Sequence, residues 1–142
     1  MGTIILDDIV VTHLKRIPTE GGDVMHGIKS LDSGFVGFGE AYFSWVKQGA
    51  VKAWKQHTRM TMNVIVPVGT VRFVFCIDGG GRYRVEDIGE ERYVRLSVPP
   101  GLWFGFQGLS VPQSLVLNVA SIEHDPTEVN RLEKNSIDYN WN

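Results

Sequence analysis

The sequence has little cysteine, little excess charge of either sign and no long apolar run. Its single cysteine, Cys76, allows no disulfide within the chain and is typical of a reducing compartment. The 14 Lys and Arg side chains nearly balance the 16 Asp and Glu side chains, so no basic footprint marks a nucleic-acid or anionic membrane surface. The longest uncharged apolar stretch, 60–71, is too short to cross a bilayer, and the first ten residues lack the basic start of a secretory signal. We therefore expect a cytoplasmic protein that binds neither nucleic acid nor membrane.

What the sequence does have is frequent glycine and proline between short runs of Val, Ile, Phe, Tyr and Trp. With 142 residues, 16 Gly, 6 Pro and no linker or repeat, residues 1–142 are expected to form one domain. The clearest strand candidates are 38–47, 50–57, 61–66, 70–77, 92–98 and 114–121. This pattern predicts an all-β fold, a barrel or sandwich of antiparallel strands.

The most apolar of these segments has hydrophobic side chains on both faces. By the two-residue period, Val71, Phe73 and Phe75 share one face, while Val74 and Cys76 share the other. Burial on both sides indicates a strand inside a barrel or sandwich, with Cys76 as a small buried hydrophobe.

Helix chemistry is confined to one place near the C-terminus. Asp125 can cap a helix, Pro126 fits its first turn, and Glu128 completes a capping box. A helix of about two turns is expected after Asp125. The terminal aromatics Tyr139 and Trp141 are expected to pack back on the barrel or on a partner.

Several landmarks resemble those of cupins, which are small jelly-roll β-barrels. The matching residues, in order, are Gly49, His57, Gly69, Pro99, Gly101 and Asn118. The positions at which cupins carry their other metal ligands hold Lys55, Thr61 or Met62, and Phe104. Because a divalent metal needs three or four N or O ligands, we expect no metal and no other cofactor.

A closer resemblance is to short members of the dTDP-4-dehydrorhamnose 3,5-epimerase family. It is carried by FGEAYFSWVKQGAVKAWKQH, MTMNVIVPVGTVRFVFCID, VPPGLWFGFQGL, SLVLNVASIEHDP and a terminal YNW, in that order. The resemblance implies a cupin-type jelly roll, metal-independent chemistry on a nucleotide-sugar in the cytoplasm, and a homodimer built by strand exchange. The family's catalytic histidine corresponds to Lys55 and its catalytic tyrosine to Leu117, so neither is retained.

A replacement proton-transfer pair is available nearby. Epimerisation beside a ketone needs a base and an acid, and strand alternation places Lys55 and His57 on one face, with Lys52 on the other. Lys55 acts as a base only if its pKa falls far below about 10.4. Tyr42, on the preceding strand, is the expected substitute for the lost acid.

Further polar and aromatic residues are candidates for substrate binding. Arg59 and Arg72 suit a diphosphate, and the other candidates are Glu40, Asn63, Trp103 and Phe104. Each also has a structural interpretation: the arginines as partners in salt bridges, the aromatics as core residues. Three functions remain open at this point: a nucleotide-sugar epimerase or isomerase acting on a 4-keto-hexose, a non-catalytic cupin that binds a sugar-nucleotide, and a structural dimer without a ligand.

Overall fold

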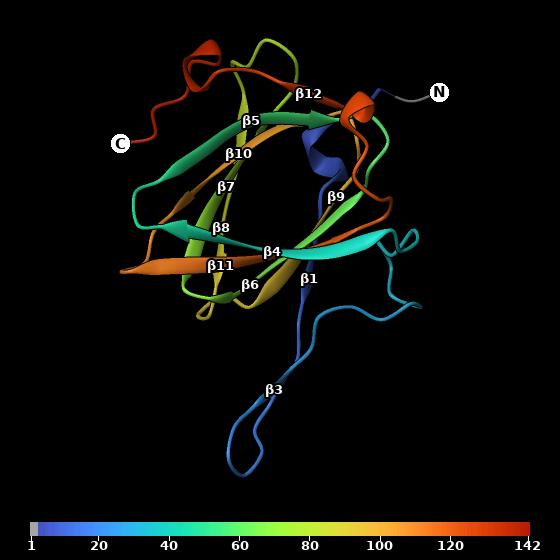
Figure 1. The fold of residues 1–142 in the computed structure, drawn as a ribbon, viewed down its shortest axis with the longest axis vertical. Coiled ribbons are helices and arrows are strands. Elements are labelled where there is room, and N and C mark those ends of the chain that lie inside the picture. The colour runs from blue at the N-terminus through green and yellow to red at the C-terminus, as the bar shows by residue number, and fades with distance from the viewer. Residues whose placement is uncertain (1–2) are drawn as a thin grey trace.

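Two five-stranded antiparallel sheets face each other in the computed structural model, which describes residues 3–142 (Figure 1). The first sheet has the order β1 (Val10–His13), β9 (Val94–Val98), β6 (Met62–Val68), β11 (Gln113–Ala120) and β4 (Glu40–Lys47). The second has the order β12 (Val129–Arg131), β5 (Val51–His57), β10 (Trp103–Gly108), β7 (Thr70–Cys76) and β8 (Tyr83–Gly89). Neighbours in each sheet are mostly distant in sequence, as in a jelly roll, so the predicted all-β fold class is confirmed.

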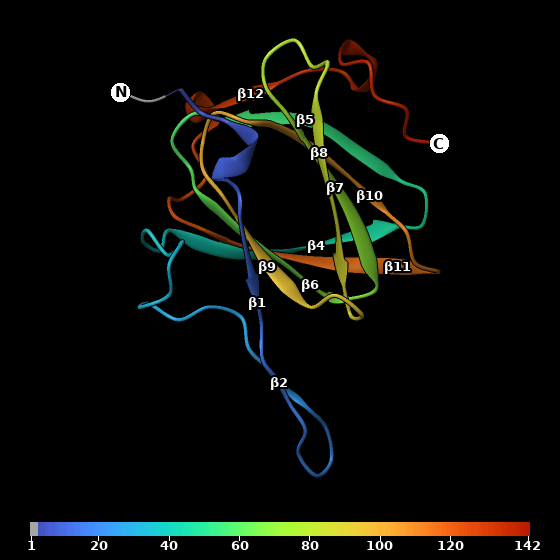
Figure 2. The same ribbon diagram turned by 180° about the vertical axis from the view of Figure 1, so that it is seen from behind.

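The smaller elements lie at the two ends of the molecule. A hairpin of β2 (Arg16–Ile17) and β3 (Val24–Met25) projects from the barrel, and the C-terminus lies at the opposite end (Figures 1 and 2). Three 3-10 turns complete the chain: η1 (Leu6–Asp8), η2 (Pro126–Glu128) and η3 (Lys134–Ser136). None of the helical turns in residues 3–142 has the length and apolarity needed to span a membrane.

The main core fills the space between the sheets. It contains Val71, Phe73 and Phe75 from β7, packed against residues such as Val64 and Leu96 of the first sheet. Burying each of these side chains contributes about 1.5–3 kcal/mol. Val71, Phe73 and Phe75 share one face of β7, as predicted, and it is the face turned to this core.

A second apolar cluster covers the outer face of the second sheet. Trp54, Val74 and Cys76 are buried there beneath the C-terminal residues Ile137 and Trp141. The tail therefore packs back on the barrel, and burial raises the pKa of the Cys76 thiol to about 11.

All six predicted strand segments form strands. The longer strands β8 and β10 were not predicted, and neither were the short strands β1, β2, β3 and β12. β8 alternates apolar and charged residues at the edge of its sheet, and β10 contains Gly105 and Gly108, which weaken a strand signal. Pairing with β5 and β7 on either side makes β10 a strand despite its composition.

The expected C-terminal helix is much shorter than predicted. Asp125 does cap the turn, because its side chain accepts a hydrogen bond from the Thr127 amide, and Pro126 begins it. The turn ends after Glu128, because the following residues pair with β5 as β12. Glu128 does not complete a capping box; its carboxylate instead accepts hydrogen bonds from the Thr58, Arg59 and Met60 amides.

Candidate active site

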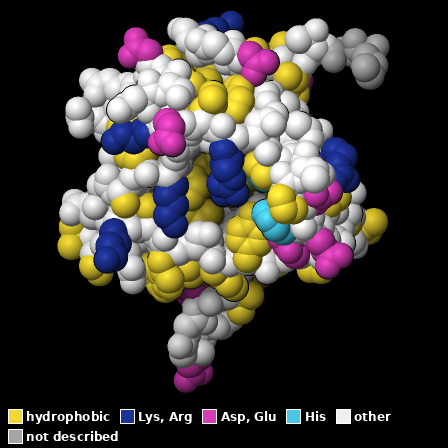
Figure 3. All heavy atoms as spheres, turned by 45° about the horizontal axis from the view of Figure 1, so that its top comes forward, with side chains coloured by type: hydrophobic (Ala, Val, Ile, Leu, Met, Phe, Trp, Pro, Cys, Tyr) yellow, Lys and Arg dark blue, Asp and Glu magenta, His cyan; other side chains and the backbone are white. Residues whose placement is uncertain are grey.

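A cavity of about 650 Å³ opens between the two sheets at the edge formed by β4, β5 and β12. Figure 3 shows Lys and Arg side chains around a hollow that has hydrophobic side chains inside it. The apolar interior includes Phe73, Phe104, Phe106, Val64 and Val116. The cavity therefore combines a cationic rim with an apolar floor, as expected for a ligand with one anionic and one less polar part.

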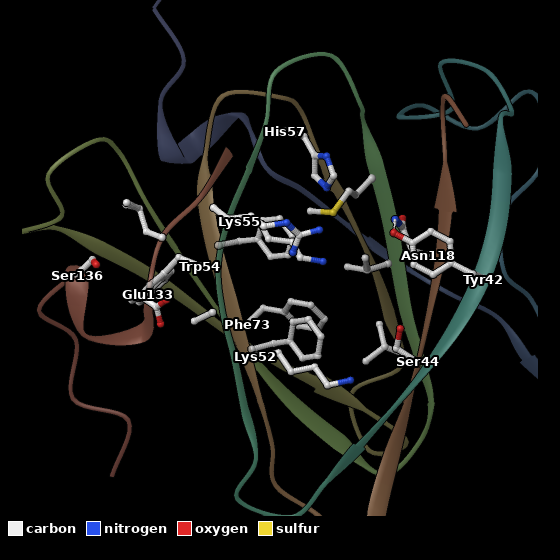
Figure 4. Close-up of a pocket in the computed structure, with 18 residues that line it drawn as sticks. Tyr42, Ser44, Lys52, Trp54, Lys55, His57, Phe73, Asn118, Glu133 and Ser136 are labelled. Atoms are coloured by element: carbon white, nitrogen blue, oxygen red, sulfur yellow. Dashed lines mark hydrogen bonds between the residues drawn. The ribbon is translucent and has the colours of Figure 1, made fainter. Parts of the chain in front are cut away.

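A β-bulge in β5 brings two lysines to the same cavity. Lys55 pairs with Phe104 and Lys52 pairs with Phe106, and the register of the β5–β10 pairing shifts between them. The extra residue in β5 reverses the alternation, so the expectation that Lys52 faces away from Lys55 is wrong. Figure 4 shows the Lys52 side chain extending into the cavity, while Trp54 lies on the other side of the strand.

Three cations are concentrated at this rim. Lys52 and Lys55 from β5 are joined by Arg131 from β12, and none of the three forms a salt bridge within residues 3–142. Partial burial, together with the nearby charges of Arg131 and Lys52, lowers the pKa of Lys55. An anionic ligand would relieve this repulsion.

Tyr42 of β4 and Asn118 of β11 form the facing wall (Figure 4). The Asn118 amide nitrogen donates a hydrogen bond to the Tyr42 hydroxyl oxygen over 3.1 Å. Asn118 is only 3% exposed, yet its Oδ1 atom has no hydrogen-bond partner within the described chain. Leu117, matched earlier to the family's tyrosine, does not line the cavity; its neighbours Val116 and Asn118 are the β11 residues that do.

On the opposite wall, His57 contacts a buried carboxylate. Its Nδ1 atom lies 2.6 Å from Glu128 Oε1, and its ring stacks on Phe104 with centroids 5.8 Å apart. Two elements distant in sequence, β5 and η2, therefore meet at this histidine.

Of the sequence-predicted candidates, four line the cavity: Lys55, His57, Tyr42 and Phe104. The remaining five lie elsewhere: Arg59, Arg72, Asn63, Glu40 and Trp103.

The two arginines have carboxylate partners outside the cavity. Arg59 contacts Asp125 at 2.5 Å, with most of its side chain exposed. Arg72 donates two hydrogen bonds to Asp87, at 2.8 and 2.9 Å, across the β7–β8 pair. Both guanidinium groups are occupied in structural ion pairs.

The other three candidates also have local roles. Asn63 bonds to Gly34 and Ser97 outside the cavity, and Trp103 donates its indole N–H to Asp78. Glu40 begins β4 and does not line the cavity. The side-chain type and strand position of these three residues suggested substrate binding, but their places are determined by contacts with residues distant in sequence.

Sequence reasoning did not identify Lys52, Arg131 and Glu128 as site residues. Arg131 and Glu128 lie in the segment predicted to be helical, and the pairing of β12 with β5 brings Arg131 to the cavity and Glu128 to His57. No local signal marks them. Across residues 3–142, no three His, Cys, Asp or Glu side chains converge as a metal site would require.

The chain is similar to several solved structures. A dTDP sugar isomerase from Desulfovibrio desulfuricans G20 is 33% identical, with a TM-score of 0.89, covering 98% of this chain and 95% of that one. The sugar 3,4-ketoisomerase QdtA from Thermoanaerobacterium thermosaccharolyticum, in complex with TDP, is 18% identical, with a TM-score of 0.78 and coverage of 94% and 95%.

A dTDP-4-dehydrorhamnose 3,5-epimerase from Sulfolobus tokodaii is 22% identical, with a TM-score of 0.79 and coverage of 97% and 84%. QdtA and this epimerase support the fold alone, because their identities are low. No protein-family model matches the chain, and no curated protein sequence does.

Proposed function

Since the chain belongs to the family of dTDP-sugar isomerases and dTDP-4-dehydrorhamnose 3,5-epimerases, we propose that it epimerises or isomerises a dTDP-linked 4-keto-hexose by proton transfer. The observation that carries this proposal is the convergence on one cavity of His57, Tyr42 and three cations that form no salt bridge within residues 3–142. These are the groups that such a reaction needs: a base, an acid and charges that hold an anionic substrate.

In the proposed reaction, His57 takes the proton from the carbon beside the ketone. The C–H electron pair forms a carbon–carbon double bond, and the ketone oxygen becomes an enolate oxygen. The Lys55 ammonium group stabilises that negative charge. For epimerisation, Tyr42 on the facing wall returns a proton to the opposite side of the same carbon. For isomerisation, the hydroxyl group on that carbon passes its proton to the enolate oxygen, a proton is returned to the former ketone carbon, and the first carbon becomes the new ketone.

The diphosphate is proposed to bind at the cationic rim, with Lys52 and Arg131 as its main contacts. Both line the cavity, and neither has a salt-bridge partner within the described residues. Arg131 suits phosphate oxygens because its guanidinium group donates two parallel hydrogen bonds. The less polar face of the sugar ring then contacts Phe73 and Phe106.

No metal or other cofactor enters this proposal. The cupin ligand positions hold Lys55, Thr61 or Met62, and Phe104, and the ammonium group of Lys55 would repel a dication at His57. We place the protein in the cytoplasm, in the biosynthesis of surface polysaccharide or deoxysugars. Elemental analysis that finds about one tightly held Zn, Fe or Mn per chain would contradict metal independence.

The test is incorporation of solvent deuterium into a panel of dTDP-, UDP- and GDP-linked 4-keto sugars. We expect wash-in with the dTDP sugars, and we expect the His57→Ala variant to lose wash-in while it still binds dTDP. Lys55→Ala should retain slower exchange, because Lys55 is not the base in this scheme. If Lys55→Ala instead abolishes exchange and His57→Ala does not, the roles are reversed.

A non-catalytic cupin is the second candidate, favoured by Lys55 and Leu117 at the family's histidine and tyrosine positions. Tight binding of nucleotide-sugars without exchange into any of them would establish this alternative.

A homodimer is also proposed. On the edge strand β4, Phe43 and Trp45 are 64% and 51% exposed, and exposed edge strands with apolar side chains are normally covered. The strand exchange implied by the family resemblance would cover them with a second copy.

A further inference from the structure

Glu128 lies in an unusual setting for a carboxylate. It is only 2% exposed, and its Oε2 atom accepts hydrogen bonds from three successive backbone amides, those of Thr58, Arg59 and Met60, each over 3.2 Å. A buried carboxylate is strongly destabilising unless it is hydrogen-bonded in this way. The chain immediately after His57 thus forms a cradle for the Glu128 carboxylate.

This cradle determines the charge of Glu128. Burial alone would raise the pKa of the carboxyl group, but the hydrogen bonds from His57 and from the Arg59 and Met60 amides hold the pKa below its usual value. Glu128 is therefore an anion at neutral pH, and an ionised carboxylate can only accept hydrogen bonds.

The charge of Glu128 determines which nitrogen of His57 carries the hydrogen. Since Glu128 Oε1 can only accept, the hydrogen in the 2.6 Å contact belongs to His57 Nδ1. In a neutral imidazole the other nitrogen, Nε2, then has a free lone pair. The ring is fixed by its stacking on Phe104, 18° from parallel, and Figure 4 shows it directed toward the cavity.

We propose that Glu128 is a positioning residue that keeps His57 in the tautomer whose unprotonated Nε2 atom faces the cavity. Glu128 also stabilises the imidazolium cation that forms when Nε2 takes a proton. This inference rests on the proposed function, in which His57 is the base. Glu128 does not touch the substrate. It acts through His57, as the aspartate of a Ser–His–Asp triad acts through the histidine that it orients.

The test combines a spectroscopic and a kinetic measurement on the full chain. Long-range proton–nitrogen correlation NMR at neutral pH, assigned with His57→Gln, should show His57 protonated at Nδ1 in the wild type. In Glu128→Gln the neutral amide no longer enforces this tautomer, and the His57 nitrogen shifts should move. With the 4-keto sugar nucleotide that gives wash-in, kcat should fall by about 10²- to 10⁴-fold while KM changes by less than about threefold.

Thr58→Val is the matched control. It removes the hydrogen bond from the Thr58 hydroxyl to the Glu128 backbone oxygen but leaves the carboxylate and all three amides in place. A merely structural role for Glu128 would make both variants lose stability alike and leave the His57 tautomer unchanged.

The outcomes separate this inference from the proposed function. A wild-type His57 protonated at Nε2, or a Glu128→Gln variant with normal kcat and unmoved nitrogen shifts, overturns the positioning role. If the wild type exchanges no sugar, the proposed function fails, while the tautomer measurement still decides the role of Glu128. That measurement on the wild type also suffices if Glu128→Gln does not fold.

Discussion

Trp141 packs against Trp54, with ring centroids 5.4 Å apart. The last aromatic residue of the chain thus rests on the back of β5, the strand whose front carries Lys52 and Lys55. Tyr139 contacts both indoles, and the Trp54 indole N–H donates to the Lys134 carbonyl oxygen. The tail therefore holds the bulged part of β5 from outside.

Trp141→Ala should destabilise the fold by about 3 kcal/mol, because it removes a buried indole and opens a cavity beside Trp54. Thermal or urea unfolding measures this change. Asn142→Ala, at the next and exposed position, is the control and should leave stability unchanged. Equal stability of the two variants would show that the tail does not hold β5.

Arg131→Met should weaken dTDP binding by about ten- to hundredfold, because it removes a charge-assisted contact to phosphate. Arg72→Met is the control, since Arg72 is paired with Asp87 away from the cavity. Isothermal titration calorimetry compares the two. Weaker binding in Arg72→Met, with Arg131→Met unaffected, would place the phosphates on the other sheet face.

Lys55→Met should stabilise the protein near neutral pH while weakening dTDP binding. The pKa of Lys55 is lowered in the folded state, so the native protein binds fewer protons than the unfolded chain as the pH rises toward 10.5. The free energy of unfolding of the wild type therefore increases as the pH rises from the folded-state pKa of Lys55 toward 10.5. Below the folded-state pKa, the full destabilisation caused by the charged Lys55 is present. Urea unfolding of both proteins across this range measures the difference, which should shrink with rising pH. A variant that is less stable than wild type at neutrality would contradict this account.

Arg95→Ala should destabilise the protein by about 3–5 kcal/mol, the usual effect of breaking a buried ion pair. Arg95 is fully buried, and its Nη1 atom donates to the Gly27 carbonyl oxygen at 2.7 Å and to Asp32 at 3.3 Å. These bonds hold the 27–33 loop on the first sheet. Chemical denaturation reports the loss, and faster amide exchange confined to that loop should accompany it.

Phe43→Glu should convert the proposed dimer into a monomer of 15.9 kDa in light scattering, because a charge would be buried in the apolar contact. Val85→Glu, on an exposed position of the opposite edge strand β8, should leave the dimer intact. A wild type that is already monomeric at micromolar concentration would refute the dimer itself.

Much of the fold could be predicted from the sequence because its strands obey the two-residue period. The alternation of Val71, Phe73 and Phe75 against Val74 and Cys76 gave both faces of β7 correctly. The two-turn helix was wrong because a capping signal is local, whereas the pairing of β12 with β5 is a long-range contact.

The candidate site was predictable only in part. His57 and Lys55 lie on the same side of the bulge in β5, and Tyr42 lies on the regular strand β4, so alternation places all three correctly. Lys52 was assigned to the wrong face because a bulge shifts the period by one residue, and such a shift reverses every side chain before it. Glu128 carried a helix-cap signal, and only its contact with His57 shows its place in the site.

The second sheet ends in a strand that is made last. Glu128, Arg131 and the tail that covers Trp54 are all translated after the other strands of the barrel. A nascent chain that has emerged only as far as β11 can pair most of its strands, yet it has no carboxylate for His57 and no guanidinium at the rim. Competence to bind the nucleotide should therefore appear only after Glu128 and Arg131 have left the ribosome, later than the pairing of the other strands.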